Sequence, residues 1–169
     1  MSVFENAAHR SELLDHLRAS FALDVKGVHG VKHWSRVWTN GRKLASLEEE
    51  AGRIIDRGVV ELFAWFHDSC RLNDEQDPEH GPRAAELVRE LRGEFFELSE
   101  VRLRELVRAC EGHTRGRTLA SPTIMVCWDA DRLDLGRVGI RPDPAYLCTP
   151  GAKRADVLGW GYSRSIAEE

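Results

Sequence analysis

A histidine and an aspartate stand side by side where a long apolar run of the chain ends, at His67 and Asp68. Residues 59–66, just before the pair, are apolar on nearly all sides of a helix, which is typical of a buried segment. A buried ionisable group needs a partner, because an unpaired buried charge is costly. A metal ion suits a neutral imidazole beside a carboxylate, so the pair indicates a metal site. The alternative is an ordinary helix end, at which His67 bonds a main-chain carbonyl.

His33 is the next candidate ligand, and it lies in the first turns of a helix that is predicted from Val31 onward. His29 precedes it by four residues and would share its face if the helix began earlier. Gly30 lies between them and argues against an earlier start, because glycine disfavours a helix interior. We therefore interpret His33 as a ligand and His29 as a rim or turn residue.

His80 follows a strong helix start, in which Asp77 is expected to be the N-cap and Pro78 the first helical residue. The positive end of the helix dipole disfavours an imidazolium in the first turn. His80 is therefore expected to stay neutral and able to bind a metal ion. Considered alone, it would instead be an exposed polar residue of the first turn.

His113 comes after the predicted end of another helix, at Gly112, and opens the basic loop 113–118. It fits a metal ligand beside an anion site, and it fits a solvated loop equally well. Farther along the chain, Asp129 and Asp131 stand two apart in a predicted helix, so they point to opposite sides. Only one of them can face a central site, and the spacing leaves open which one.

These residues must be positioned by helices, because the apolar residues recur at spacings of three and four. No alternating apolar and polar run predicts a strand, and no repeat, low-complexity stretch or linker divides the chain. The sequence therefore predicts a single all-α domain over residues 1–169. The helices are expected at residues 4–22, 31–47, 56–70, 78–92, 99–112, 121–135 and 152–167, with a short helical segment at 143–148.

The composition supports a globular protein and excludes several classes. The chain has 169 residues, 42% of them apolar, which is enough for one domain with one core. A net charge of −4 and a pI near 6.0 do not favour binding to nucleic acid or to an anionic membrane. No run approaches the ~18 apolar residues of a membrane span, and residues 1–6 do not resemble a signal peptide. The widely spaced cysteines are interpreted as buried, reduced thiols of a cytoplasmic protein: Cys70, Cys110, Cys127 and Cys148.

In chain order the candidates read H…HD…H…H…D, and this order resembles the HD-domain superfamily of metal-dependent phosphohydrolases. The resemblance covers roughly residues 29–141. Residues 33–37 (His-Trp-Ser-Arg-Val) are similar to the family's first-histidine helix, and residues 66–68 (Phe-His-Asp) contain its central pair. Residues 129–134 (Asp-Ala-Asp-Arg-Leu-Asp) are similar to its closing A-D-R-L segment. Residues 79–85 resemble the H-x-x-x-A segment of members that hold two metals.

The resemblance implies an HD-like helical bundle with its core at about residues 29–141 and with the terminal helices packed on it. It also implies which residues bind metal, and it selects Asp131 over Asp129. The first site would be formed by His33, His67, Asp68 and Asp131. The second site would be formed by His80, His113 and Asp68, whose carboxylate can bridge two ions.

The donor set and the resemblance together indicate a metal-dependent phosphohydrolase. Four imidazoles and two carboxylates suit Mn, Fe, Co, Ni or Zn better than Ca or Mg, so two divalent transition metals are expected. A water activated by the metals would attack a nucleotide or another small phosphate ester or anhydride. His67 and Asp68 are the expected catalytic residues. The arginines expected to hold the phosphate are Arg71, Arg83, Arg115 and Arg117.

Two other classes of function remain open. Some proteins with this ligand set resemble di-iron oxygenases that cleave C–C or C–P bonds, and fold and ligands do not exclude that chemistry. A non-catalytic nucleotide-binding module would bind a ligand without consuming it. The sequence contains neither a G-x-S-x-G motif nor a glycine-rich Walker loop, so it offers no rival nucleophile or phosphate loop of those kinds.

Overall fold

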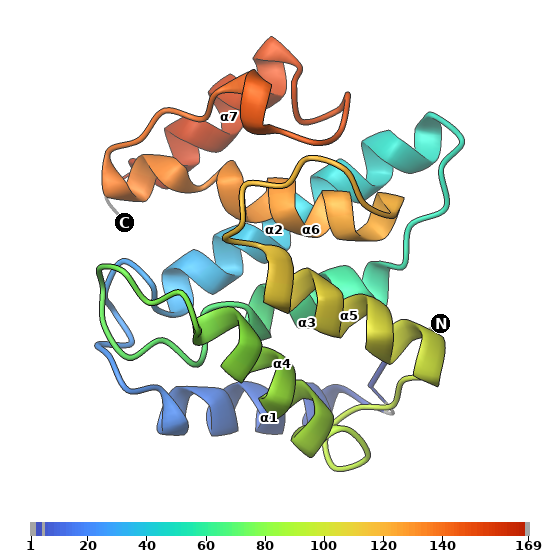
Figure 1. Ribbon diagram of the computed structural model, residues 1–169, viewed down its shortest axis with the longest axis vertical. Coiled ribbons are helices and arrows are strands. Elements are labelled where there is room, and N and C mark those ends of the chain that lie inside the picture. The colour runs from blue at the N-terminus through green and yellow to red at the C-terminus, as the bar shows by residue number, and fades with distance from the viewer. Residues whose placement is uncertain (1–2, 5, 168–169) are drawn as a thin grey trace.

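The longest helix, α2 (Val31–Glu50), crosses the middle of the view in Figure 1 behind other helices, and two of the central helices pack against it. The computed structural model describes residues 3–4 and 6–167. Helices α3 (Arg57–Phe66) and α6 (Pro122–Arg132) both pack on α2 and also on each other. These three helices are the frame on which the rest of the chain is arranged.

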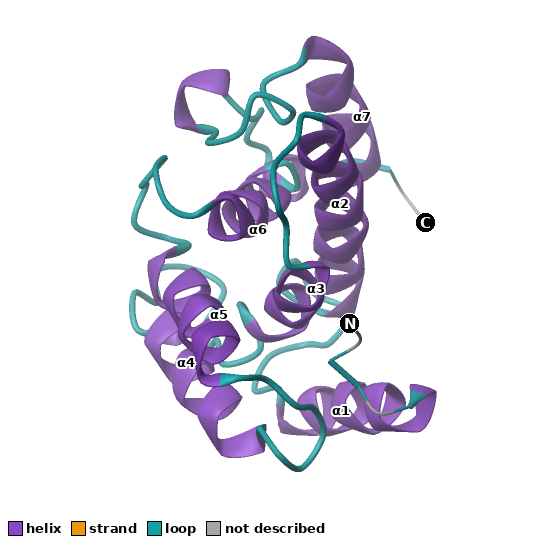
Figure 2. Cartoon of the chain, turned by 90° about the vertical axis from the view of Figure 1, so that its right-hand side faces the viewer, coloured by secondary structure: helices purple, strands orange, loops and turns teal. Residues whose placement is uncertain are grey.

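Four more helices surround this frame (Figure 2). Helices α4 (His80–Leu91) and α5 (Glu100–Gly112) pack closely together, and α5 also contacts α3 and α6. Helix α1 (Ala7–Ser20) lies against α3 at one end of the molecule. Helix α7 (Ala155–Ser165) lies against α2 at the other end. None of the six predicted metal ligands lies on the terminal helices α1 and α7.

Helix α3 is buried because its sequence is apolar on nearly every side. Apart from Glu61, residues 59–66 are at most 4% exposed. Asp56 caps the helix, and its carboxylate accepts two hydrogen bonds of 3.1 Å from main-chain N–H groups of the first turn. Such a cap typically contributes about 1 kcal/mol. Because α3 ends inside the core, His67 and Asp68 directly behind it are buried as well.

The all-α prediction is confirmed. Over residues 3–4 and 6–167 the chain forms seven α-helices and no strand, with one isolated bridge between Arg92 and Phe96. Helix bounds differ from the predicted ones in places. The first helix is shorter than residues 4–22 and is capped by Asn6, whose side chain accepts two main-chain hydrogen bonds. The third helix stops at residue 66 rather than 70, because residues 67–70 form turns.

Asp77 is not an N-cap and Pro78 is not the first helical residue, so both predictions are wrong. Helix α4 begins at His80, with Glu79 at the capping position and a turn before it. The Asp77 carboxylate instead accepts a hydrogen bond of 2.9 Å from Leu72 N and one of 2.5 Å from Arg83. The Asp77 carboxylate therefore bonds to Leu72 and Arg83 and does not cap the helix, although the local sequence pattern predicts that it does. His80 nevertheless keeps its predicted place in the first turn.

The C-terminal third also differs from the predicted bounds. Helix α6 ends at Arg132, and the 3-10 helix η1 (Leu135–Val138) follows it. The short segment predicted to run to residue 148 is only the 3-10 helix η2 (Pro144–Tyr146). Residues 148–149 leave the helical path because their main-chain N–H groups donate to the carboxylate of Asp129, at 2.8 and 2.7 Å. Helix α7 then begins at residue 155 rather than 152.

All four cysteines are free thiols, as the sequence predicts, but the prediction that all four are buried is wrong, because Cys70 and Cys148 are partly exposed. Cys110 and Cys127 are buried, and burial raises the pKa of both thiols. Among the described helices, none has the length and apolar character that crossing a membrane requires.

Candidate metal centre

Five helix ends meet on one side of the molecule, on the left of the view in Figure 1. Together they carry the six predicted ligands, which are His33 at the start of α2, His67 and Asp68 directly after α3, His80 at the start of α4, His113 directly after α5, and Asp131 in the last turn of α6. Five of these six residues are at most 5% exposed. The side chain of Asp131 is 17% exposed, so solvent reaches the centre at Asp131.

The imidazoles form two pairs, and Asp68 lies between them. The Nε2 atoms of His33 and His67 are 3.0 Å apart, and those of His80 and His113 are 2.8 Å apart. Oδ2 of Asp68 is 3.4 Å from Nε2 of His33, and Oδ1 is 3.0 Å from Nε2 of His80. Each carboxylate oxygen therefore faces one pair, as a carboxylate that bridges two ions must.

Each of these imidazoles uses its other ring nitrogen, Nδ1, for a hydrogen bond to an acceptor. In His67, His80 and His113 the acceptor is a main-chain carbonyl three or four residues earlier, at 2.5–3.2 Å. In His33 the acceptor is Oδ2 of Asp134, at 2.7 Å. Because these acceptors require a proton on Nδ1, a neutral ring is left with a lone pair on Nε2.

Two buried lone pairs that face each other at such short range repel unless a proton or a metal cation lies between them. Two groups of donor atoms within residues 3–4 and 6–167 are close enough to share an ion: His33, His67 and Asp68, and Asp68, His80 and His113. Imidazole nitrogen and carboxylate oxygen are common donors to zinc and to other divalent transition metals. The residues present therefore fit a metal centre.

Burial and charge set the protonation of the first site. Burial alone would lower the pKa of His33, but hydrogen bonds to three neighbouring carboxylates raise it to about 9. Burial lowers the pKa of His67. Burial would raise the pKa of Asp68 and Asp131, yet the imidazoles around them hold both well below the usual range. In the absence of metal, His33 is thus the protonated imidazole of this site, and both carboxylates are ionised.

Asp129 and Asp131 have different partners. Oδ1 of Asp131 lies 3.4 Å from Nε2 of His33, in the first site. Asp129 points the other way, and its carboxylate accepts hydrogen bonds of 2.8 Å from Cys148 N and 2.7 Å from Thr149 N. Asp129 thereby fastens the segment after η2 to α6 and takes no part in the centre.

His29 belongs to the centre, although its spacing led us to interpret it as a rim or turn residue. The side chain is buried, and its Nδ1 lies 2.7 Å from Oδ2 of Asp68. Its Nε2 lies 3.3 Å from Asp74 O. The loop before α2 brings it there, and the contact joins residues 39 apart in the chain. No local pattern could have revealed a contact of that kind.

Asp134 connects His33 to an arginine. Its Oδ2 faces Nδ1 of His33, and its Oδ1 accepts a hydrogen bond of 2.7 Å from Nε of Arg36. Asp134 is 1% exposed, so water cannot solvate its negative charge, and Arg36 offsets that charge instead. The helical spacing places Asp134 on the face of Asp131, and its role as the residue that orients His33 emerges only from the contacts.

Arg137 points toward two carboxylates of the candidate centre, those of Asp68 and Asp131. Its Nη2 lies 4.0 Å from Oδ2 of Asp68 and 3.9 Å from Oδ1 of Asp131. Its other nitrogens donate to main-chain carbonyls, Nε to Val28 O at 2.9 Å and Nη1 to Asp134 O at 3.1 Å. One side of the guanidinium is therefore fixed while the other faces the centre. No sequence motif marks this residue, because η1 lies beyond the last segment that the motifs cover.

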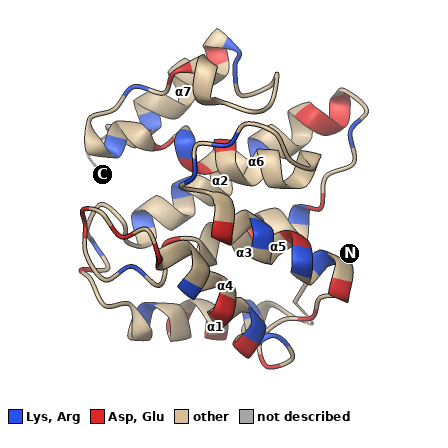
Figure 3. Cartoon of the chain, in the orientation of Figure 1, with Lys and Arg blue, Asp and Glu red and all other residues tan. Residues whose placement is uncertain are grey.

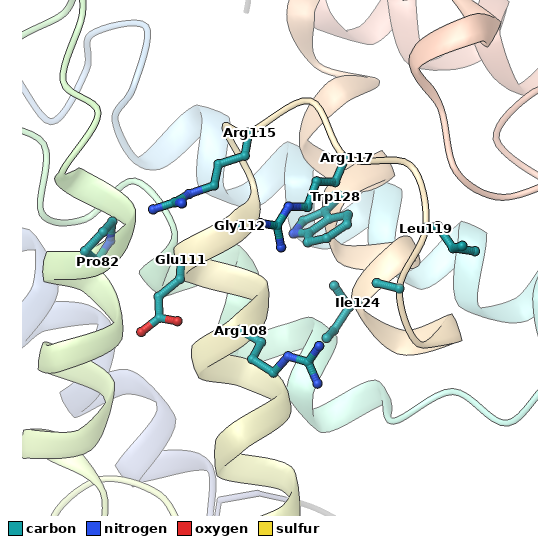
Figure 4. Close-up of a pocket in the computed structure, with 10 residues that line it drawn as sticks. Pro82, Arg108, Glu111, Gly112, Arg115, Arg117, Leu119, Ile124 and Trp128 are labelled. Carbon is teal, nitrogen blue, oxygen red and sulfur yellow. The ribbon is translucent and has the colours of Figure 1, made fainter.

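The four arginines predicted to hold phosphate lie in different places. Arg71 reaches the centre, with its Nε 3.2 Å from Oδ1 of Asp68. Arg83 is tied to a carboxylate and a carbonyl of the loop before α4. Arg115 and Arg117 line a separate cavity, to which none of the six predicted ligands contributes (Figure 4).

Gly81 sets how closely α4 approaches α5, and with it the second site. A Cβ at this position would lie 2.4 Å from Cys110 O, a main-chain atom that cannot yield easily. We expect Gly81→Ala to cost about 1–3 kcal/mol of stability, as overpacking typically does, and to weaken metal binding by His80 and His113 selectively. Thermal unfolding and metal content test this, with Gly159→Ala as control, because a Cβ there meets nothing within 4 Å. Unchanged stability and metal content in Gly81→Ala would contradict the expectation.

Comparison with known proteins agrees with this fold. No protein-family model matches the chain, and no curated protein matches it. Among solved structures, the chain is similar to a crystal structure from an uncultured Thermotogales bacterium that is described as a predicted HD superfamily hydrolase. The TM-score is 0.68 and the identity 24%, over 92% of this chain and 86% of that chain. The similarity shows that the helices are arranged as in that protein, whereas function has to be argued from the site.

Proposed function

We propose that this chain, which has the fold of an HD superfamily protein, is a metal-dependent phosphohydrolase. Its substrate would be a nucleotide or another small phosphate ester or anhydride. The observation that carries the proposal is the pair of facing imidazoles on each side of Asp68, with Nε2 atoms 3.0 and 2.8 Å apart. Two divalent transition metals held by these pairs would share Asp68, and two-metal sites of this kind serve phosphoester hydrolysis.

The protein's own contribution is to hold the ligands in place. Bound divalent ions would supply a Lewis acid for a phosphoryl oxygen and would lower the pKa of a water molecule. The ring orientations of the four histidines are fixed by main-chain carbonyls and by Asp134. The two oxygens of Asp68 are fixed by His29 Nδ1 at 2.7 Å and Arg71 Nε at 3.2 Å. Such partners tune metal ligands and limit their rearrangement.

Arg137 is placed to hold a phosphoryl group. The centre meets solvent at Asp131, and Nη2 of Arg137 lies 3.9 Å from the Oδ1 atom of that residue. A guanidinium presents planar paired donors that match phosphate oxygens. In this proposal Arg137 and Arg71 are the arginines that face the substrate's phosphate.

Arg137→Gln is expected to lower kcat/KM by about 10–100-fold, the usual cost of losing a hydrogen bond to a charged group. Metal content should stay unchanged, because Arg137 donates no ligand. Steady-state kinetics and metal analysis of the same preparation check both statements. Arg42→Gln is the control, because Arg42 is exposed and lies over Trp38, away from the centre. Metal loss from Arg137→Gln would mean that the residue acts on the ligands rather than on the substrate.

The proposed function is tested by metal analysis of the purified protein, followed by a screen of nucleotides and phosphoesters with Mn, Fe, Co, Ni and Zn. Phosphate release that requires metal and stops with a chelator is the expected result. Turnover that consumes oxygen in the iron-loaded protein would replace the proposal with oxygenase chemistry. Saturable nucleotide binding without any turnover would replace it with a binding module.

A further inference from the structure

A cavity of about 390 Å³ lies on the outer side of α5, between α4, α6 and the loop that joins α5 to α6 (Figure 4). Its volume is in the range that accommodates a small organic molecule. The lining combines three arginines with apolar side chains and contains none of the six predicted metal ligands. This cavity is therefore a different place from the metal centre, although Gly112 in its wall directly precedes His113.

The three arginines are Arg108 on α5, and Arg115 and Arg117 on the loop that follows. Figure 4 shows the guanidinium groups of Arg108 and Arg117 on the side of the cavity formed by Ile124 and Trp128. Basic residues are also visible on α5 and on this loop in Figure 3. The cavity thus has a positive wall in a chain whose net charge is −4.

None of these three arginines forms an ion pair with a carboxylate in the part of the chain that the structure describes. Most other arginines do, for example Arg102 with Asp56 at 2.6 Å. The one acid in the lining, Glu111, is 3.4 Å from the guanidinium of Arg89. Like charges gathered without acidic partners repel, and a bound anion removes that repulsion.

The main chain beneath two of the arginines is anchored. Gly116, between Arg115 and Arg117, has a φ of +66°, in the left-handed region that favours glycine. Nη2 of Arg132 donates to Arg117 O at 2.7 Å, and its Nη1 donates to Tyr146 O at 2.8 Å. The loop is therefore fastened to α6, which keeps its arginines beside the cavity.

Another part of the wall is apolar. Ile124 and Trp128 are only 2% and 3% exposed, so both side chains are packed into the protein. The indole of Trp128 is held in place because its Nε1 donates a hydrogen bond of 3.0 Å to Ala109 O. Leu119, at the edge, is 84% exposed despite its large apolar side chain. A ligand with an apolar or aromatic part would cover this leucine while its anionic part meets the arginines.

We propose that this cavity binds an organic phosphate of the size of a nucleoside monophosphate, apart from the metal centre. The phosphate lies against Arg108 and Arg117, and the apolar or aromatic part lies toward Leu119. Arginine suits this role because its planar donors match phosphate oxygens. The inference does not depend on hydrolysis at the metal centre.

The test is calorimetric titration of the metal-free protein with AMP in the presence of a chelator, so that no turnover interferes. Wild-type protein should bind AMP saturably, and adenosine should bind at least about tenfold more weakly because it lacks the anion. Replacing both Arg108 and Arg117 with glutamine should weaken AMP binding by about tenfold or more. Arg104→Gln is the matched control, because Arg104 is exposed on the same helix, one turn before Arg108, and does not line the cavity.

Several results would overturn the inference. These are the absence of saturable AMP binding, equal binding of AMP and adenosine, and equal AMP affinity in wild type and the double variant. Arg137→Gln separates the two places. If Arg137→Gln weakens AMP binding while the double variant at Arg108 and Arg117 does not, AMP binds at the metal centre and the cavity does not bind it. Phosphate release in the metal-loaded protein is measured separately, so failure of either proposal leaves the other standing.

Discussion

Asp68→Asn is expected to lower metal-dependent turnover by about 10³-fold or more and to strip metal from both sites. The carboxylate stands between the two imidazole pairs, 3.4 Å from Nε2 of His33 and 3.0 Å from Nε2 of His80. Asparagine keeps the shape but lacks the charge and one of the two oxygens, so it cannot bridge two ions. The expected loss exceeds the ~10–100-fold that is typical of residues that only orient a ligand. Metal content per chain and phosphate release from the most active substrate are the measurements.

Two further variants serve as a comparison and as a control for Asp68→Asn. His67→Ala should also lose metal and activity together, because it removes a ligand of the first site. Asp15→Asn should change neither metal content nor turnover, because Asp15 is exposed on α1. Circular dichroism during thermal unfolding establishes that each variant is folded. A folded Asp68→Asn protein with full metal occupancy and normal turnover would rule out Asp68 as the bridge.

His80→Ala and His113→Ala are each expected to lower the metal content from two ions per chain toward one, while the first site persists. The rate constant kcat should fall by about 10²–10³-fold, the scale of losing one preorganised electrostatic contact. One divalent charge is largely offset by Asp68 and Asp131, so a second ion supplies the positive field that a multiply charged phosphate needs. KM should change less, because the lost interaction is made mainly in the transition state.

The second site is tested most directly by the number of ions in the wild-type protein. Saturation with Mn or Fe should give about two ions per chain. His16→Ala is the control for removing a histidine, because His16 is exposed on α1 and its ring contacts Phe95 rather than any of the six predicted ligands. If wild type binds a single ion and His80→Ala keeps full activity, the centre is mononuclear. It would then consist of His33, His67, Asp68 and Asp131 alone.

The helices and the ligands at their ends were predictable because both follow from local rules. The apolar residues before His67 mark α3 as buried whatever surrounds it, and the acidic, proline-containing segment before His80 indicates a nearby helix start, although α4 begins two residues later than predicted. The order of the histidines and aspartates then added the resemblance that selects Asp131. Helix ends were less predictable, because they depend on hydrogen bonds to other segments. The Asp77 carboxylate accepts from Leu72 and Arg83 instead of capping a helix, and the Asp129 carboxylate accepts from the main chain of residues 148–149, which are not helical.

The partners of the ligands were not predictable, because they depend on contacts between distant segments. His29 reaches Asp68 across 39 residues, and Arg36 reaches Asp134 across 98. Arg137 comes from η1, which no motif covers, and its direction is set by carbonyls at residues 28 and 134. Periodicity reports which face of a helix is buried, but it carries no information about which side chain of another element that face will meet.

The way in which the histidine rings are oriented has a consequence for sequence drift. Three of the four rings are held by main-chain carbonyls of their own turn, at 2.5–3.2 Å, and no substitution elsewhere can delete a carbonyl. Only His33 relies on a side chain, that of Asp134. In homologues that keep the metal centre, the positions corresponding to residues 63, 64, 77 and 110 are therefore free to vary in side chain as far as ring orientation is concerned. Among the four rings, only that of His33 can lose its orienting partner through a single side-chain mutation, at Asp134.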